Sequence, residues 1–481
     1  MAVVMWFRQD LRLADNPALA AAVATGQPII PLYCLDDLGD GDWPMGAAQR
    51  WWLHESLAAL DAALHQRGSR LVLRRGVSDR VLRELSTTAD VSAIYWNRRY
   101  EPAVIERDRA IKASLESYGI EGCSSNGSLL NEPWEIRNQA GKPFQVFTPY
   151  WRHCLKRDDP IAPLAVPKQL TGPANWPATL PLAALELLPR MRWYEAMARQ
   201  WQPGERGAAT SLRQFVQSTV WSYAENRNLP AIDGTSQLSP HLHFGEVSPR
   251  QIWHAVRKRA EQERIPAAEW RTNQFLTEVY WREFAYHLLW HFPHTPSEPL
   301  RTEFKDFPWA AEDAQLTAWQ RGRTGIPMVD AGMRELWATG WMHNRVRMIV
   351  ASFLVKNLLV PWQDGARWFW DTLVDADLAS NTAGWQWCAG SGADAAPYFR
   401  IFNPVSQGEK FDPEGAYVRT WVPELAKLPE KYIHAPWTAP ADVLSAAGVR
   451  LDHDYPAPIV DLKETRDRAL NAYQTMRGTA D

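Results

Sequence analysis

Three side chains that could bind a flat ligand lie close together on one predicted helix. Glu278, Trp281 and Arg282 stand at i, i+3 and i+4, so they share one face of a helix over residues 273–292. Glu278 and Arg282 could form an ordinary surface ion pair, worth about 0.3–0.5 kcal/mol. Alternatively, an acid, an aromatic plate and a cation could line a pocket for a base-like ligand.

A second group of polar residues precedes a strongly apolar helical segment over residues 341–359. Asn344, Arg347 and Met348 share one face there, and arginines at the mouth of a buried helix need partners. Asp375 and Asp377 could supply them, and residues 377, 381 and 385 then follow at helical spacing. Polar groups gathered this densely predict a bound polar ligand rather than a plain core.

A loop of small and hydroxyl residues, 233–239, lies between helical stretches. Its hydroxyls and backbone amides could hold a phosphate at a helix start. An ordinary helix cap is the alternative, because Asp-Gly and Ser-Pro are common punctuation.

Two further patterns do not predict a site. His287 and His291 have zinc-like spacing, but no acid follows His287 and a third ligand is missing, so we expect packing or capping histidines. The glycines of 390–395 match a dinucleotide-binding loop in letters only, because no plausible strand precedes them.

Strand and helix patterns alternate in the first 158 residues. Buried strands are expected at 3–7, 29–35, 71–73 and 93–97, with helices over 47–66, 77–85 and 103–118. This alternation predicts an α/β domain with a parallel, Rossmann-like sheet. The first strand is followed by Trp-Phe-Arg-Gln-Asp-Leu-Arg rather than by a glycine-rich phosphate loop.

Residues 159–190 are rich in proline and predict a connector without regular structure. From 191 to 481 the strand patterns vanish, so we expect an all-helical second domain.

Composition excludes several protein classes. The chain has 481 residues, a net charge of −3, 46% hydrophobic residues and 26 tryptophans, which fits a folded protein rather than a disordered or collagen-like one. No apolar run could span a bilayer. Arg8, Asp10 and Arg12 argue against a secretory signal, and the four cysteines show no close pairing. We expect a cytoplasmic protein, with any DNA binding confined to a local basic groove.

Six motifs occur in an order that resembles the DNA photolyase/cryptochrome family. They are Trp6-Phe-Arg-Gln-Asp-Leu-Arg12, Gly234-Thr-Ser, Trp281-Arg-Glu-Phe284, Gly340-Trp-Met-His-Asn-Arg345, Asp375-Ala-Asp-Leu-Ala-Ser-Asn381 and Tyr398-Phe-Arg-Ile-Phe-Asn-Pro404. The likeness spans nearly the whole chain. It implies an α/β domain, a connector and a helical domain that binds FAD and damaged DNA.

The resemblance also implies roles for individual residues. FAD contacts are expected at Tyr223, Thr235, Ser236, Gln237, Leu238, Ser239, Arg347, Asp375, Asp377 and Asn381, with Arg347 pairing Asp375 and Asn381 facing flavin N5. Lesion or phosphate contacts are expected at Arg227, Glu278, Trp281, Arg282, Asn344, Arg345, Met348 and Trp387. Trp385, Trp362 and Trp309 match three tryptophans through which electrons reach the flavin.

The chemistry implied is light-driven repair of cyclobutane pyrimidine dimers by electron transfer from reduced FAD, catalysed by a carbon–carbon lyase. Photolyases for the (6-4) photoproduct place a second histidine after the first, whereas here His343 is followed by Asn344. A blue-light photoreceptor and a (6-4) photolyase are the alternatives.

A second, antenna chromophore is the least determined feature. An Asn-Glu pair of folate-carrying members is replaced by Ala103-Val104, while Arg50-Trp-Trp-Leu53 and Asn131-Glu-Pro-Trp134-Glu resemble the plant-cryptochrome-like branch. We favour methenyltetrahydrofolate; a deazaflavin or no antenna stay open. The expected partner is UV-damaged DNA, with no membrane, no obligatory protein partner and a monomeric state.

Overall fold

The computed structural model describes residues 1–310, 312–395, 397–398 and 400–478. Its contacts divide the chain into two compact units. Unit 1 comprises Met1–Trp221, Ser236–Pro293 and Val374–Ala379, and unit 2 comprises Ser222–Thr235, His294–Leu373 and Ser380–Asp481. The domain boundaries expected at 159 and 190 stay a prediction; residues 159–181 form neither helix nor strand.

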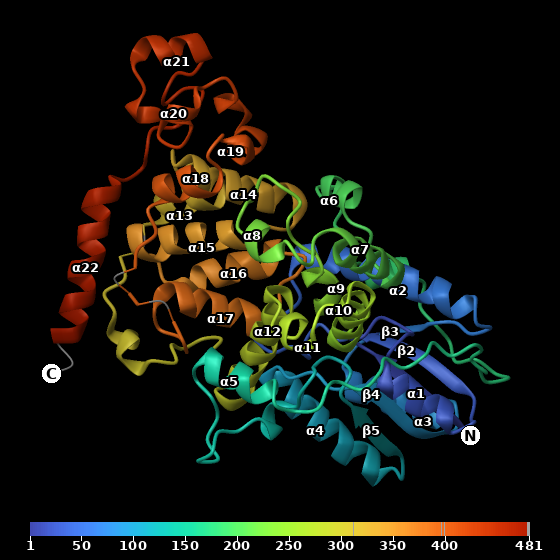
Figure 1. Ribbon diagram of the computed structural model, residues 1–481. Coiled ribbons are helices and arrows are strands. Elements are labelled where there is room, and N and C mark those ends of the chain that lie inside the picture. The colour runs from blue at the N-terminus through green and yellow to red at the C-terminus, as the bar shows by residue number, and fades with distance from the viewer. Residues whose placement is uncertain (311, 396, 399, 479–481) are drawn as a thin grey trace. The chain divides into compact units, whose positions relative to one another are not determined.

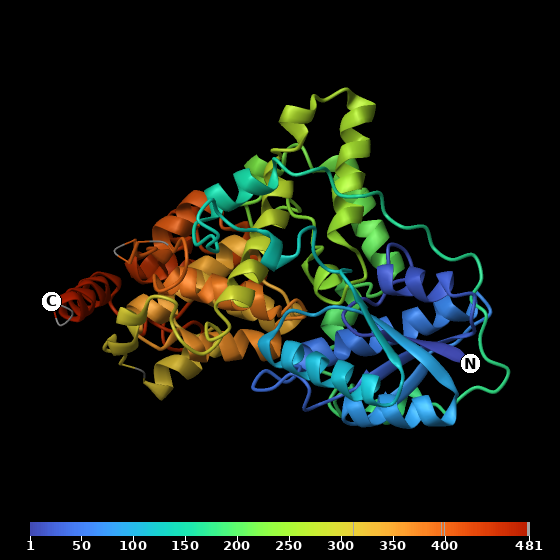
Figure 2. The ribbon, with the colours of Figure 1, turned by 90° about the horizontal axis from the view of Figure 1, so that it is seen from below.

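The strands and the first helices alternate along the chain. They are β1 (Ala2–Phe7), α1 (Pro17–Ala24), β2 (Ile29–Leu35), α2 (Ala47–His65), β3 (Val72–Arg75), α3 (Ser78–Thr88), β4 (Val91–Asn97), α4 (Pro102–Ser117), β5 (Glu121–Ser125) and α5 (Phe147–Cys154). In Figure 1 the blue to cyan strands lie beside α1, α3 and α4, and Figure 2 gives the same region from below.

All later regular elements are helical among the described residues. They are α6 (Glu195–Gln200), α7 (Glu205–Ser218), α8 (Tyr223–Asn226), α9 (Ser239–His243), α10 (Pro249–Glu263), α11 (Ala267–Trp270), α12 (Gln274–His291), α13 (Asp313–Gln320), α14 (Pro327–Thr339), α15 (Asn344–Ser352), the π-helix η4 (Phe353–Asn357), α16 (Trp362–Thr372), α17 (Leu378–Ala389), α18 (Pro404–Phe411), α19 (Ala416–Trp421), α20 (Glu430–Ile433), α21 (Ala441–Ala447) and α22 (Leu462–Gly478). Short 3-10 turns are η1 (Pro133–Glu135), η2 (Leu182–Leu185), η3 (Thr302–Asp306), η5 (Pro423–Leu425) and η6 (Pro436–Thr438).

The sheet of unit 1 is parallel and five-stranded, in the order β3-β2-β1-β4-β5. Val3 of β1 pairs with Ile29 of β2 on one side and with Ala93 of β4 on the other. The strand order reverses between β1 and β4, and ligands of open α/β sheets bind beyond the carboxyl ends of strands at such a point. The Rossmann-like α/β class expected from sequence is therefore confirmed, and the fold leaves a crevice there.

One face of the sheet has a core that explains why these strands are apolar. Side chains at alternate positions of β1, β2 and β4 pack against leucines and an isoleucine of α3 and α4: Val4, Trp6, Ile30, Leu32, Ile94, Trp96, Leu82, Leu85, Ile111 and Leu115. A strand buried on both faces reads as a continuous apolar run, which is why β1, β2 and β4 were predictable. β5 was missed, because Glu-Gly-Cys-Ser-Ser is polar and only partly buried.

The helix expected over 341–359 is wrong at both ends. Gly340 ends α14 in the left-handed conformation (φ +67°), and residues 341–343 are not helical, so α15 begins at Asn344. α15 then passes into the π-helix η4, and Leu359 has a positive φ of 54°. The helix expected over 273–292 is confirmed as α12.

Candidate functional site

In unit 1, α12 presents Glu278 and Trp281 one turn apart on one face. The Trp281 indole lies flat on the ring of Phe147 at the start of α5, with ring centroids 3.8 Å apart and planes 9° from parallel. Trp151 of α5 also stacks on Phe147, with ring centroids 6.4 Å apart and planes 15° from parallel. Glu278 accepts a hydrogen bond from Gln274 Nε2 at 2.7 Å. Glu278 and Trp281 therefore share one face of α12, and their contact with a ligand stays a prediction.

Arg282, on the same helix, contacts other residues of unit 1. Its guanidinium donates to Ser128 O at 2.8 Å and lies 4.8 Å from the ring centre of Tyr286. The neighbouring Glu283 is buried and accepts from the backbone amides of Leu130 and Asn131 at 2.9 and 3.0 Å. These bonds fix loop 128–131 on α12; a DNA or lesion contact of Arg282 stays a prediction.

Asp377 is a buried carboxylate of unit 1 with several stabilising neighbours. Tyr286 donates its hydroxyl to Asp377 Oδ2, and His243 Nδ1 lies 4.0 Å from the same oxygen. Burial alone would raise the pKa of Asp377, but the neighbouring His243 and Arg282 hold it below its usual range. Asp377 is therefore an ionised group, as a counter-charge to a polar ligand requires. Asp375 is also buried in this unit, whereas Arg347 belongs to unit 2, so their pairing stays a prediction.

The 233–239 loop is shaped by local bonds. Gln237 has a left-handed φ of 50°, the Leu238 amide donates to Ser236 Oγ at 3.3 Å, and Ser239 opens α9. A Cβ on Gly234 would come within 2.8 Å of Asn226 O, so only glycine fits. The loop contains the predicted FAD contacts from Thr235 to Ser239, and these contacts stay a prediction.

In unit 2, the start of α15 carries the predicted lesion residue Asn344 at the surface and Met348 half-buried. His343 is the N-cap: its Nδ1 accepts from the Arg345 amide at 3.2 Å. Burial, together with nearby Arg347, Arg345 and Arg227, lowers the pKa of His343 to about 4, so this imidazole is neutral.

Positive charge gathers beside the start of α15. The Arg345 guanidinium binds Asn228 Oδ1 at 2.7 Å and lies over the Phe411 ring, and the Arg227 guanidinium lies over Tyr223 at the start of α8. Burial and the nearby Arg227 lower the pKa of Arg345. Two cations held this close favour an anionic partner.

Asn381 and Trp385 share one face of α17. Asn381 Nδ2 donates to Ala366 O of α16 at 3.0 Å, and a Cβ on Gly365 would come within 2.1 Å of the Trp385 indole. The indole also packs edge-on against Phe369 and Trp319, at 5.0 and 6.2 Å between ring centres. Glycine at 365 is therefore required for the indole to lie against α16.

The other predicted tryptophans also lie in unit 2. Trp362 is buried at the start of α16, Trp309 is half-buried beside Phe307, and Trp387 stacks on Phe402 at 6.4 Å. The order from buried Trp385 and Trp362 to partly exposed Trp309 suits a path from interior to surface, but electron transfer through them stays a prediction.

A cleft lies at the carboxyl ends of β1 and β2 in unit 1. It mixes aromatic, acidic and basic side chains: Trp6, Arg8, Gln9, Tyr33, Cys34, Leu35, Asp36, Asp37, Asp40, Met45, Arg50, Leu53, Ser78, Arg99, Arg107 and Phe244. It lies beside the point where the strand order reverses, as the topology predicts.

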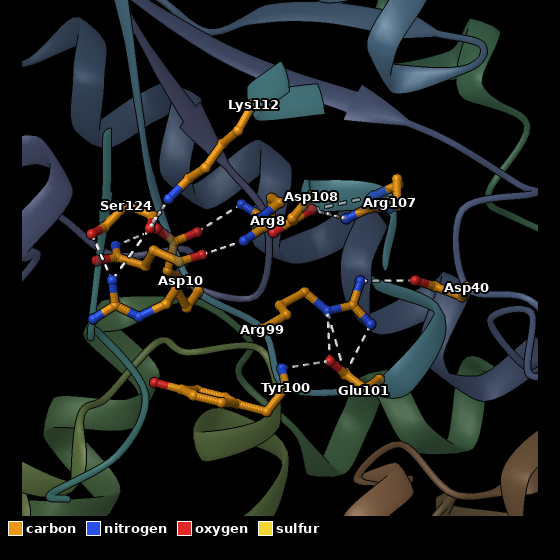
Figure 3. A network of polar contacts seen from close by, with 12 residues as sticks. Arg8, Asp10, Asp40, Arg99, Tyr100, Glu101, Arg107, Asp108, Lys112 and Ser124 are labelled. Atoms are coloured by element: carbon orange, nitrogen blue, oxygen red, sulfur yellow. Dashed lines mark hydrogen bonds and ion pairs between the residues drawn. The ribbon is translucent and has the colours of Figure 1, made fainter. Parts of the chain in front are cut away.

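Ion pairs hold the arginines of this cleft in place (Figure 3). Arg8 binds Asp108 at 2.7 and 2.8 Å, and Arg99 binds Asp40 and Glu101, each at 2.9 Å. Burial lowers the pKa of Arg99, but the charges of Asp40 and Glu101 outweigh it and raise the pKa above its ordinary value. This cleft was not predicted from the sequence, because its residues come from five separate segments.

Phe147 was also missed, although it supports Trp281. The two residues are far apart in sequence, and only an aromatic at the start of a helix could have signalled the contact. The histidines behave as expected: His287 Nε2 accepts from the Phe144 amide, while His287 Nδ1 and His291 Nε2 donate to Pro133 O. No group that could hold a metal ion occurs in the described ranges.

Comparison with known proteins places this chain in a family. The DNA photolyase family model matches residues 3–168, and the FAD binding domain of DNA photolyase matches 275–475. Deoxyribodipyrimidine photo-lyase from Agrobacterium fabrum is 49% identical over 99% of this chain and 98% of its own length. Cryptochrome-1 from Arabidopsis thaliana is 42% identical over 98% of this chain and 70% of its own length. A bacterial class III photolyase structure from Agrobacterium tumefaciens matches with a TM-score of 0.95, 49% identity, and coverage of 99% and 98% of the two chains. The chain belongs to the DNA photolyase and cryptochrome family.

FAD is the cofactor that this family domain implies, and the residues fit it. Among the described residues, Trp385 Nε1 is buried without a hydrogen-bond partner, on the face of α17 that also carries Asn381. A polar ligand at that face would satisfy it. In the described part of the chain, no helix is long and apolar enough to cross a bilayer.

Proposed function

We propose that this chain is a light-driven deoxyribodipyrimidine photo-lyase that splits cyclobutane pyrimidine dimers in DNA. The Agrobacterium fabrum relative bears that name, at 49% identity over nearly the full length of both chains. The observation that carries the proposal is the stack of Trp281 on Phe147, with Glu278 one turn away. This pairing suits a ligand that is flat, apolar and edged with carbonyl and N–H groups.

The substrate explains why these residue types are needed. A dimer must leave the base stack before an enzyme can reach it, and that step costs a few kcal/mol. Stacking on an indole returns about 1–3 kcal/mol per base. Glu278 accepts or donates a hydrogen bond at the dimer's carbonyl and N–H edge, which supports charge that develops there. Asn344, Met348 and Trp387 are the contacts proposed from unit 2.

DNA backbone contacts are proposed for Arg227 and Arg345. Their closeness concentrates positive charge although the whole chain carries a net charge of −3. Phosphate contacts position the duplex without reading its sequence, as repair of any dipyrimidine site requires.

The residues proposed to hold FAD are Tyr223, Thr235, Ser236, Gln237, Leu238, Ser239, Arg347, Asp375, Asp377 and Asn381. When bound, reduced and excited by blue light, FAD supplies the electron that opens the cyclobutane ring. The ionised Asp377 fixes local charge, and Asn381 presents a neutral amide rather than an acid. Trp385, Trp362 and Trp309 are the proposed oxidisable side chains.

We further propose that the cleft of unit 1 binds methenyltetrahydrofolate as antenna. Aspartates can accept hydrogen bonds from the amino and N–H groups of a pterin, and arginines can pair with the carboxylates of a glutamyl tail. The cleft holds both types: Asp36 and Asp37 beside Arg50 and Arg107. Trp6 and Tyr33 add aromatic surface.

The antenna proposal is tested by Arg107→Gln. The purified protein, reconstituted with FAD and the folate, should lose folate while FAD content is unchanged. Arg109→Gln is the matched control on α4, because Arg109 is exposed and paired with Glu106. Equal folate content in both variants, or a flavin recovered from the cleft, would overturn the assignment.

The proposed activity is tested by binding of three duplexes in darkness: undamaged, with a cyclobutane dimer and with a (6-4) product. The reduced protein should prefer the dimer duplex and release it after blue light. Preference for the (6-4) duplex would favour a (6-4) photolyase. Equal binding of all three, with FAD bound, would favour a blue-light photoreceptor.

A further inference from the structure

We propose that Glu335 and Tyr417 are positioning residues that set where α15 begins, and thereby place Asn344 and Arg345 for the damaged strand. This inference deepens the proposed function and rests on it. All residues concerned lie in unit 2.

The first turn of α15 has an incomplete capping box. In a capping box, the N-cap side chain accepts a backbone amide of the first turn, and a Glu or Gln at N3 accepts the N-cap amide in return. His343 performs the first half, since its Nδ1 accepts from the Arg345 amide. The N3 residue of α15 is Val346, which has no polar side chain and cannot perform the second half.

Glu335 of α14 supplies the acceptor that Val346 cannot provide. Its Oε2 accepts the His343 amide at 3.2 Å, so the orphan N-cap amide has a partner. The same oxygen accepts the Tyr417 hydroxyl at 2.6 Å. Glu335, Tyr417 and His343 are all buried, with exposed fractions of 7%, 2% and 2%. Buried polar groups joined in this way fix one geometry, because leaving any one unpaired is costly.

Tyr417, which binds Glu335 from α19, is held in place by Asp412. Asp412 accepts the amides of Tyr417 and Val418 at 2.9 and 3.1 Å, which caps the start of α19. Glu335 is thus held between α19 and the first turn of α15. Asn344 is the first residue of α15, so any shift of the His343 amide moves Asn344 and the Arg345 side chain.

The charge on Glu335 adds a readout that a purely structural residue would not give. Burial raises the pKa of Glu335 to about 7, against hydrogen bonds from Tyr417 and the His343 amide and the charge of Arg347. The groups that face it are Tyr417 from α19, the backbone amide of the N-cap His343, and Arg347 from α15; Asp412 acts on Tyr417. His343 stays neutral near pH 7, so it does not contribute to a transition there.

The test uses the full-length, FAD-loaded protein with Tyr417→Phe, which deletes one hydroxyl, and Glu335→Gln, which cannot ionise. Tyr432→Phe of the half-buried tyrosine in α20 is the matched control. Tyr417→Phe should weaken binding of dimer-bearing DNA about fivefold, the effect of losing one ordinary hydrogen bond. Binding of undamaged DNA should weaken less, because undamaged DNA shares the phosphate contact of Arg345 but not the lesion contact of Asn344. FAD content should be unchanged. Hydrogen exchange of the residue 343–346 amides should rise in Tyr417→Phe and not in Tyr432→Phe.

The pH profile gives the second arm. Wild-type affinity for the dimer duplex should rise as the pH increases through about 7, because the ionised carboxylate accepts both donors. Glu335→Gln should remove this step. Unchanged exchange at 343–346 together with wild-type affinity in Tyr417→Phe would overturn the positioning role. A third outcome separates the two proposals: exchange at 343–346 rises in Tyr417→Phe, but the wild-type protein binds dimer-bearing and undamaged DNA equally. The coupling of Tyr417 to the start of α15 then stands. The proposed function fails, and with it the placement of Asn344 and Arg345 for a lesion.

Discussion

Replacing Phe147 by leucine should leave Trp281 in the chain but remove the ring on which its indole stacks. The two rings are 3.8 Å apart and nearly parallel, and such pairs contribute about 0.5–1.5 kcal/mol beyond the area they bury. At about 1.4 kcal/mol per tenfold change in affinity, lesion binding should weaken by about 2- to 12-fold. Leucine removes ring volume as well as the stack, so unfolding should become easier by about 1–3 kcal/mol.

The assay is titration of a fluorescent dimer-bearing duplex in darkness, with an undamaged duplex alongside. Phe304→Leu is the control, because Phe304 is equally buried but lies in an aromatic cluster of unit 2. Trp281→Ala sets the upper limit, since it removes the plate entirely. The reasoning about the plate is refuted if Phe147→Leu binds the dimer as tightly as Phe304→Leu does.

Three further predictions concern protonation and electron transfer. Burial raises the pKa of Glu283 from 4.5 to about 7, so folding stability should fall as the pH rises from 4.5 through 7. The melting temperature of Glu283→Gln should therefore fall less than that of the wild type between about pH 5 and about pH 8. An equal fall in both proteins would contradict this. Trp385→Phe should abolish photoreduction of the flavin, followed by absorbance, while chemically reduced protein still repairs; loss of both activities would make Trp385 structural. Asn381→Asp should alter the reduction potential of the flavin with DNA affinity near normal, because aspartate cannot donate to Ala366 O as Asn381 Nδ2 does; an unchanged potential in spectroelectrochemistry would count against the placement of Asn381.

The parts of the fold that the sequence predicted are those with a strong local signal. β1, β2 and β4 are continuous apolar runs, and α12 has a clear helical period. β5 is polar and partly exposed, so neither run length nor alternation marks it. The true start of α15 depends on a carboxylate from α14 that binds the His343 amide, and no local pattern shows such a contact.

The candidate site likewise contains residues that could be predicted from the sequence and residues that could not. Glu278 and Trp281 were predictable because helical spacing puts them on one face. Phe147 and the arginines of the cleft were not, since their partners lie in other segments and only the folded sheet and loops bring them together. The resemblance to a family supplied residue roles, but it carries no information on these supporting contacts.

The central claim is light-driven repair of one lesion, and direct counting of repaired bases tests it. The reduced protein is incubated with oligonucleotides that carry a cyclobutane dimer or a (6-4) product, in blue light and in darkness, and the restored pyrimidines are quantified by chromatography. The account predicts restored bases only from the dimer and only in light. Intact dimer after illumination of protein with bound, reduced FAD would contradict it.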